Sequence, residues 1–296
     1  MIPLSLAEPF DFEFFRHGLL AATLVGGICG LVGTYVVLRR MSYIGHGMSH
    51  AVFGGAVVGY VLGWNFYLVA GAWGFISALL INATTKRRQI GADAAIGIVT
   101  TASFAFGVAL ISRAHSFTRN FDAALFGNLL GVTTSDLMVI GSVTAATVIA
   151  LFFAYKQMLF LTFDPEVAAT YGVPADWIDA LFGLILAATI IVSINVMGVT
   201  LIAAALVIPP VIARLLTDSF ARMLVLATAL GAITGFAGIY VSYFVDVASG
   251  ATIVLFAAGC FILTLVFVII RSRFRVNRGT VAARLSLPVE DGSLFE

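Results

Sequence analysis

Long apolar stretches separated by short polar connections fill almost the whole chain. Each stretch has roughly 17–25 mostly apolar residues, the length that a helix needs to cross a lipid bilayer. They lie at about 16–38, 44–63, 65–85, 92–112, 135–155, 177–195, 197–216, 223–245 and 250–270. The pattern predicts an all-α polytopic membrane protein with about eight or nine transmembrane helices, the fourth and seventh stretches giving the weakest signals.

The composition agrees with this prediction and excludes some other classes of protein. Of the 296 residues, 61% are hydrophobic and only 10% are charged, a balance that soluble domains of this length do not have. The formal net charge is +1, so the chain offers no basic face for nucleic acid. The expected surroundings are therefore a lipid bilayer, with no nucleic acid partner.

The basic residues indicate how the helices are oriented, because short cytoplasmic loops carry an excess of Lys and Arg. They follow alternate apolar stretches, at Arg39, Arg40, Lys86–Arg88, Lys156, Arg214, Arg222 and Arg271–Arg278. These residues all fall on one side if the N-terminus is outside and the C-terminus is cytoplasmic. We therefore expect a single transmembrane domain over 1–278, followed by a polar cytoplasmic tail over 279–296.

Two histidines, His46 and His50, lie inside the second apolar stretch. Residues four apart share one face of a helix, so the two imidazoles can meet. An imidazole pair can hold a borderline metal ion such as Zn²⁺, and an ionisable side chain inside a membrane segment marks a pathway or a binding site. The alternative is that both histidines only form hydrogen bonds with neighbouring backbone or hydroxyl groups.

A polar segment at about 156–176 interrupts the middle of the chain and carries the signals of a short helix. Asp164 is suited to cap it, Pro165 to occupy its first position, and Glu166 to lie in its first turn. The helix would run to about Tyr171, with Gly172 as the residue after its C-terminal cap. Such an amphipathic helix is either a docking element for a soluble partner or a purely structural interfacial helix.

Several motifs of enzymes are missing from the sequence. There is no Gly-x-x-x-x-Gly-Lys-Ser/Thr phosphate loop, no Gly-x-Ser-x-Gly elbow and no His-Glu-x-x-His pair. The two cysteines, Cys29 and Cys260, lie in apolar segments far apart and form no ligand cluster. The sequence therefore predicts a protein that is not an enzyme and has no nucleotide-binding site of its own.

The chain resembles, over nearly its whole length, the membrane permease subunit of the zinc/manganese/iron class of ABC importers. Five segments in the same order carry the resemblance: 38–52 (LRRMSYIGHGMSHAV), 93–98 (DAAIGI), 163–172 (FDPEVAATYG), 201–210 (LIAAALVIPP) and 240–250 (YVSYFVDVASG). The fold implied is that of a type II ABC importer, a homodimer around a central pathway.

The resemblance also implies a metal site. In the family the second helix typically reads Gly-Asp-x-x-Ser-His, with the acid and the histidine implicated in metal binding. His50 fills the histidine position here, but His46 stands where the acid is usual, which suits zinc better than manganese. In the family the fourth helix usually begins with a pair of acidic residues. In this chain Asp93 is present, but its neighbour Ala92 is not acidic. Asp93 either joins the histidines around one ion or serves only as a helix cap.

The polar segment takes a specific role from the resemblance. In the family the Asp-Pro-Glu-x-Ala helix docks into a groove of the ATP-hydrolysing subunit. The matching residues of this coupling segment (156–176) are Asp164, Pro165, Glu166, Ala168 and Gly172. Two weaker pathway candidates are Asn195, before the seventh stretch, and Asp246, at the outer end of the eighth. Asp246 is alternatively a helix cap or part of the mouth of the dimer.

The implied function is ATP-driven import of a divalent metal across the inner membrane of a prokaryote. Zinc or manganese is the expected cargo, with iron as a further candidate, and no cofactor is expected to be permanently bound. The expected partners are an ATP-binding subunit, an extracytoplasmic metal-binding protein and a second copy of the chain. Alternatives are a proton-coupled carrier that uses His46, His50 and Asp93, and an ABC permease for a metal chelate such as a siderophore or corrinoid.

Overall fold

The computed structural model describes residues 7–85, 92–114, 127 and 131–285, and all regular structure in these ranges is helical. The helices are η1 (Glu8–Asp11), α1 (Glu13–Leu38), α2 (Ser42–Leu62), α3 (Phe66–Thr85), α4 (Ala92–Ala114), α6 (Thr134–Phe153), α7 (Tyr155–Phe163), α8 (Pro165–Thr170), α9 (Ala175–Met197), α10 (Ile202–Leu216), α11 (Phe220–Val245) and α12 (Ser249–Leu285). The predicted all-α class is confirmed. The basic run at Lys86–Arg88 lies outside the described residues.

Each predicted apolar stretch coincides with one of these helices. Within the described ranges, seven helices are long and apolar enough to cross a membrane, which confirms a multi-pass membrane protein. The other two stretches correspond to α2, whose histidines and glycines lower its hydropathy, and to α10, which has only 15 residues. Crossing of the membrane by these two helices stays a prediction.

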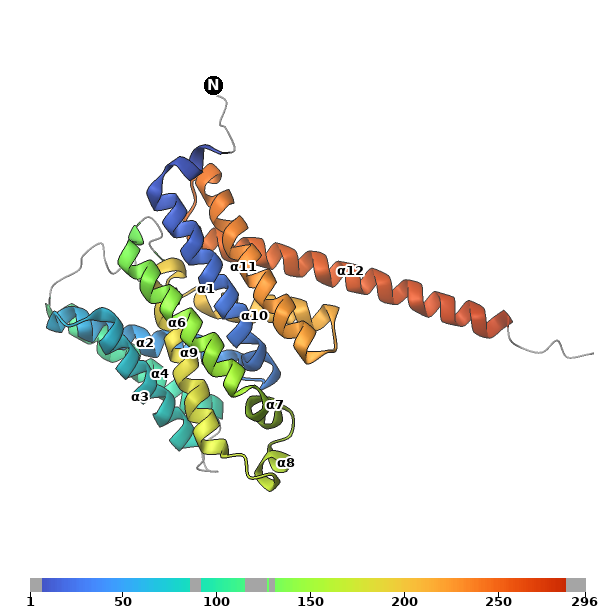
Figure 1. Cartoon of the computed structure of the whole chain (residues 1–296), viewed down its shortest axis with the longest axis horizontal. Coiled ribbons are helices and arrows are strands. Elements are labelled where there is room, and N and C mark those ends of the chain that lie inside the picture. Colours follow the sequence, from blue (N-terminus) through green and yellow to red (C-terminus); the bar gives the residue numbers. More distant parts are fainter. Residues whose placement is uncertain (1–6, 86–91, 115–126, 128–130, 286–296) are drawn as a thin grey trace, which may run out of the picture.

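Helix α1 lies inside the bundle and packs along α11 with the two backbones in direct contact (Figure 1). A side-chain carbon at Gly26 would overlap the carbonyl oxygen of Gly231, and one at Gly30 would overlap that of Ala227. Small residues on facing helices permit this approach, which replaces the missing hydrophobic driving force between helices in lipid. The contact fixes α1, and with it the start of α2, relative to the rest of the bundle.

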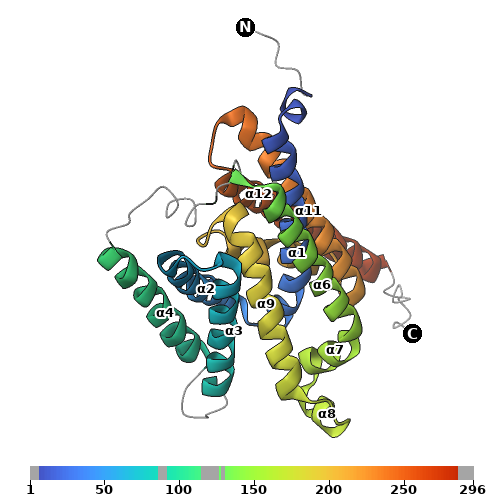
Figure 2. The same cartoon turned by 60° about the vertical axis from the view of Figure 1, so that its left-hand side comes forward.

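Helices α2, α3 and α4 form a second packed group beside α9 (Figure 2). Gly47 of α2 faces Ile96 of α4, and further along both helices Ser103 donates a hydrogen bond of 3.0 Å to the carbonyl oxygen of Ala51, so α2 and α4 run in the same direction. Trp73 of α3 donates to the Ser103 hydroxyl at 2.6 Å. These bonds tie the three helices together next to His50 and Phe104.

Helices α7 and α8 lie at the end of the molecule opposite η1 and the start of α1 (Figures 1 and 2). Ala213 of α10 and Met223 of α11 pack beside Val37, near the end of α1. Arg214 and Arg222 therefore lie near the end of α1, where two more arginines follow that helix. Much of the predicted basic side is thus assembled at one end of the bundle.

Helix α12 packs on the bundle through its first turns and then diverges from it (Figure 1). Only 11% of its most apolar part is buried, so most of that surface faces outward from the chain. The helix continues past residue 278, where the polar tail was predicted to begin, as far as Leu285. The remainder of the predicted tail, 286–296, lies outside the described residues.

Candidate functional site

The histidine pair, His46 and His50, lies near the start of α2 with the two side chains in contact. Their Nε2 atoms are 3.3 Å apart. His46 is exposed, whereas His50 is half-buried and packs edge-to-face against Phe104 of α4, with ring centroids 4.9 Å apart. The pair therefore has one side supported by α4 and another open at the surface of the chain.

The distance between the two nitrogens is compatible with two different states. Two imidazole nitrogens bound to one tetrahedral Zn²⁺, each at about 2.0–2.1 Å, lie about 3.4 Å apart. The observed 3.3 Å is close to this spacing. It also fits a hydrogen bond in which one neutral imidazole donates and the other accepts. The spacing of the two nitrogens is thus compatible with either a hydrogen bond or a shared cation.

The other ring nitrogen of His50 is unusual for a metal ligand. Nδ1 of His50 is buried and has no hydrogen-bond partner in the described part of the chain. Metal-binding histidines almost always donate their second N–H to a carboxylate, a carbonyl or a water molecule, which fixes the tautomer and the ring orientation. Among the described residues, none therefore supplies the second contact that orients a metal-binding imidazole at His50.

Asp93 lies in the first turn of α4 and is exposed. Because α2 and α4 run in the same direction with Gly47 beside Ile96, Asp93 lies about one helical turn away from the level of His46. Among the described residues, no group of three or more His, Cys, Asp and Glu side chains is close enough to hold a metal ion. The structure brings His46 and His50 together and leaves Asp93 outside that pair.

The short helix of the coupling segment is α8, and its ends follow the predicted signals. Asp164 caps the helix by accepting a 2.9 Å hydrogen bond from the backbone N–H of Val167, and Pro165 occupies the first position. At the other end Gly172 has φ = 73°, a left-handed conformation that glycine adopts without a side-chain clash. The N–H of Val173 returns to the carbonyl oxygen of Ala168 at 3.0 Å.

An apolar groove lies beside α8. It has a volume of about 390 Å³ and is lined by Leu159, Phe160, Phe163, Asp164 and Val167. Tyr171 stacks on Phe160, with ring centroids 6.2 Å apart, and is itself 77% exposed. Exposed aromatic side chains around a groove are typical of a protein-binding surface. Ala168 is buried, whereas Glu166, on the same helix, is exposed.

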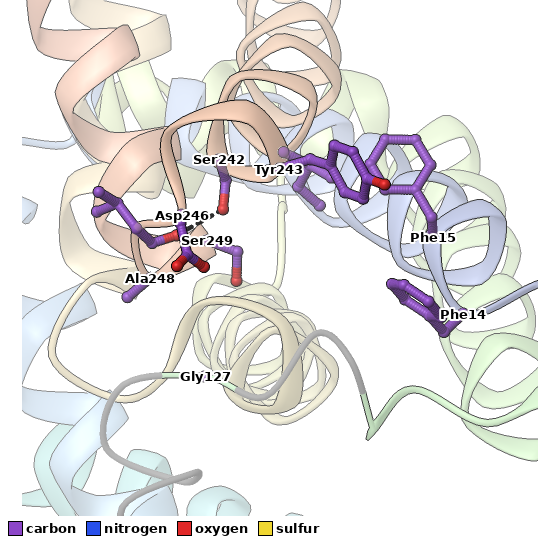
Figure 3. Close-up of a pocket in the computed structure, with 10 residues that line it drawn as sticks. Phe14, Phe15, Gly127, Ser242, Tyr243, Asp246, Ala248 and Ser249 are labelled. Carbon is purple, nitrogen blue, oxygen red and sulfur yellow. Dashed lines mark hydrogen bonds between the residues drawn. The ribbon is translucent and has the colours of Figure 1, made fainter. Parts of the chain in front are cut away.

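The two weaker candidates have different surroundings. Asn195 lies near the end of α9, and its side chain is not among those described. Asp246 is the C-cap of α11 and has φ = 56°. It lines a pocket of about 480 Å³ with Ser249 and Tyr243 (Figure 3). Phe14 and Phe15 also line this pocket, so it lies near the start of α1, at the end of the molecule opposite α8 (Figure 1). Asp246 thus occupies the C-cap position through its backbone N–H, which bonds the carbonyl oxygen of Ser242 at 3.0 Å, and the residue also borders the pocket.

Sequence reasoning missed a charged interaction at the end of the bundle near α8. Arg39, used above only as an orientation signal, forms an ion pair of 2.8 Å with Asp179 of α9. The Arg39 side chain is only 9% exposed. The only signal for this pair in the sequence was a carboxylate close to the start of an apolar stretch, which is also where helix caps occur. Nothing in the spacing linked it to Arg39.

Comparisons with known proteins agree with this architecture. The model of the ABC 3 transport family matches residues 11–268. The manganese transport system membrane protein MntC of Halalkalibacterium halodurans is 38% identical over 257 residues, which cover 87% of this chain and 88% of that protein. The chelated iron transport system membrane protein YfeD of Yersinia pestis is 30% identical over 262 residues, which cover 88% of each chain.

A solved structure is similar over the same extent. PsaBC from Streptococcus pneumoniae, determined in complex with Fab, matches with a TM-score of 0.81 and 32% sequence identity. The match covers 88% of this chain and 95% of that chain. The similarity therefore extends over most of this chain and is not confined to one hairpin.

Proposed function

The chain belongs to the ABC 3 transport family and is a membrane permease, and we propose that its cargo is a divalent transition metal brought into the cytoplasm. The names of its relatives refer to manganese and to iron. The observation that carries the proposal is the histidine pair, two imidazole nitrogens 3.3 Å apart on a partly exposed face of α2. Imidazole ligands favour borderline metals, so we expect zinc to be accepted at least as well as manganese.

The proposed orientation has η1 outside and α8 in the cytoplasm. It is supported by the position of η1 and α8 at opposite ends of the bundle (Figure 1). Arg39 and Arg40 lie at the end near α8, as the excess of positive charge on the cytoplasmic side requires. The membrane is then the inner membrane of a prokaryote, and Asp246 borders a pocket on the side where a metal-binding protein would deliver the cargo.

ATP hydrolysis is assigned to a separate subunit that binds α8. The support for this assignment is the capped helix of the coupling segment, which presents Glu166 and the exposed ring of Tyr171 next to an apolar groove. The rigid caps at Asp164 and Gly172 preorganise the helix, which lowers the entropy cost of binding. Cytoplasmic exposure of this surface follows from the proposed orientation.

The proposed functional unit is a homodimer with the metal pathway between the two copies. Two imidazoles fill only two positions of a metal ion's coordination shell, and the described part of one chain supplies no third His, Cys, Asp or Glu beside them. His46 is exposed, so a second copy or water molecules can supply the remaining ligands. A weak and incomplete site also suits transport, because the ion must leave again.

The test is uptake of radioactive zinc and manganese by proteoliposomes. They contain the chain with its ATP-binding subunit and are supplied with its metal-binding protein, with and without ATP. His50→Ala is compared with the wild type and with His17→Ala, a matched change of a histidine on α1 whose ring nitrogen lies 3.9 Å from Glu13. We expect ATP-dependent uptake that falls at least about tenfold in His50→Ala and stays unchanged in His17→Ala.

Other outcomes would contradict the proposal in different ways. Equal uptake by His50→Ala and the wild type would remove the histidine pair from the pathway. Uptake that ignores ATP and follows a proton gradient would indicate a secondary carrier. Uptake of a chelate but of neither free ion would replace the proposed cargo.

A further inference from the structure

Arg39, at the end of α1, contacts both of the helices that flank α8. On α7, which precedes α8, its Nε donates to the Thr162 hydroxyl at 3.2 Å, and one Nη lies 3.7 Å from the sulfur of Met158. On α9, which follows α8, its other Nη donates to Asp179 at 2.8 Å. Its guanidinium carbon lies 4.8 Å above the ring of Phe182. One side chain therefore holds both ends of the loop that carries α8.

The surroundings of this contact make it hard to separate. The Arg39 side chain is 9% exposed, so the guanidinium is largely shielded from water, whereas the Asp179 side chain is 39% exposed. Separation of the two would leave a poorly solvated guanidinium without its counter-charge. Since the planar guanidinium donates in fixed directions, it also keeps Thr162 and Asp179 in one relative geometry. We expect α7, α9 and the end of α1 to move together.

The residues that follow Arg39 in the chain connect α1 directly to α2, the helix that carries the histidine pair. The next residue, Arg40, adopts a left-handed conformation with φ = 56°. Its N–H bonds the carbonyl oxygen of Val37 at 3.1 Å, and the N–H of Met41 bonds that of Val36 at 2.9 Å. These two bonds close a tight turn of the kind that ends helices. Met41 is the N-cap of α2, so the hydrogen-bonded turn joins Arg39 to the start of α2 without a flexible linker between them.

We propose that Arg39 is a positioning residue that passes a displacement of α8 to the histidine pair on α2. The proposal rests on the proposed function, because it takes the ATP-binding subunit as the source of the displacement. The path consists of α8, the clamp of Arg39 on α7 and α9, the closed turn at Arg40, and α2 itself. Coupling of this kind needs an element that both sites bias, and the clamped end of α1 is that element.

The first test compares transport with ATP consumption. The complex carries Arg39→Lys, which keeps the charge but loses the planar fork, or Asp179→Asn, which removes the counter-charge. Arg40→Lys, the same change at the exposed next residue, is the matched control, because the turn at Arg40 is closed by backbone hydrogen bonds that a lysine side chain leaves in place. We expect metal transported per ATP to fall about tenfold in both clamp variants, with ATP hydrolysis retained and Arg40→Lys unaffected.

The double variant shows whether the two residues act through one contact. Arg39→Lys combined with Asp179→Asn should lose no more than either single variant, because the interaction is already broken. Unchanged transport per ATP in the single variants would overturn the proposal. So would a proportional loss of transport and ATP hydrolysis, because that result indicates a role in folding or assembly only.

The second test does not depend on the identity of the cargo. Hydrogen exchange of backbone amides is measured with the ATP-binding subunit, before and after addition of a non-hydrolysable ATP analogue. In the wild type we expect changes both at α8 and across 41–50. In Arg39→Lys the change at α8 should remain and the change across 41–50 should be lost.

The outcomes separate the two proposals. No change at α8 in the wild type would contradict the proposed ATP-binding partner. A change at α8 with none at 41–50 in the wild type, or an equal change at 41–50 in Arg39→Lys, would overturn the role of Arg39. A 41–50 response that is present in the wild type and lost in Arg39→Lys, in a complex that takes up neither zinc nor manganese, would leave the Arg39 path supported and the cargo wrong.

Discussion

Gly47 is the next residue after His46 and lies where α2 packs directly on α4. A side chain added at this position therefore tests the packing beside the histidine pair. A methyl group at this position would lie 2.7 Å from Cγ2 of Ile96 and 3.0 Å from Cγ2 of Thr100. Ile96 is 2% exposed and Thr100 is 4% exposed, so neither side chain has room to turn away. We therefore predict that Gly47→Ala forces α2 and α4 apart at the level of the histidine pair.

The size of the effect follows from these distances. Carbon atoms in ordinary contact lie about 3.5–4.0 Å apart, so the two helices must separate by about 1 Å. Overpacking of this kind costs about 1–3 kcal/mol. The separation would also draw His50 away from Phe104, which supports its ring at a centroid distance of 4.9 Å. A misplacement of about 1 Å in a functional group can lower a rate about 100-fold.

Two assays on purified protein measure this prediction. Thermal unfolding in detergent gives the loss of stability, and metal uptake in proteoliposomes gives the loss of transport. Gly141→Ala on α6 is the matched control, because a methyl group there meets nothing within 4 Å. Both changes gain a similar helix propensity of about 1 kcal/mol, so their difference isolates the steric cost at Gly47. Equal unfolding temperatures and equal uptake in the two variants would refute the reasoning.

Two further predictions concern the ligand set and the coupling segment. His46→Asp replaces an imidazole by a carboxylate at the position where the family usually has an acid. We expect the ratio of zinc uptake to manganese uptake to fall by at least about tenfold, measured by competition between the two ions, and an unchanged ratio would show that His46 does not touch the cargo. Asp164→Ala removes the cap that accepts from Val167 N–H at 2.9 Å, so α8 should lose about 1 kcal/mol and bind the ATP-binding subunit more weakly in a titration. Asp164→Asn keeps the cap and should bind nearly as the wild type does, whereas equal weakening by both changes would point to the charge of Asp164.

Local signals in the sequence were enough to predict α8. Asp164, Pro165 and Gly172 act on the backbone within a few residues of themselves, and the helix begins and ends where they require. The four-residue spacing of His46 and His50 likewise depends only on helix geometry, and the two rings do meet. Such features depend on neighbours in the chain, so a single sequence contains them.

The lengths of the apolar stretches were also decided by the sequence, because a bilayer of fixed thickness requires helices of matching length. They predicted the positions of α1, α3, α4, α6, α9, α11 and α12 as helices able to span a membrane. The lower hydropathy of α2 and the shorter length of α10 do not decide whether these two helices cross the membrane. Composition therefore settles the class of the fold and most of its elements.

Only the tertiary structure decided which faces of these helices meet. Lipid is as apolar as a leucine side chain, so a helix face that packs on another helix looks much like one that faces lipid. The sequence could not show that Arg39 meets Thr162 and Asp179, more than a hundred residues away, or that Gly47 lies against Ile96. It equally left open whether Asp93 joins the histidines, and the packing of α2 beside α4 places Asp93 outside the pair. The sequence determined the helices and the chemistry of their residues, and the packing decided which residues act together.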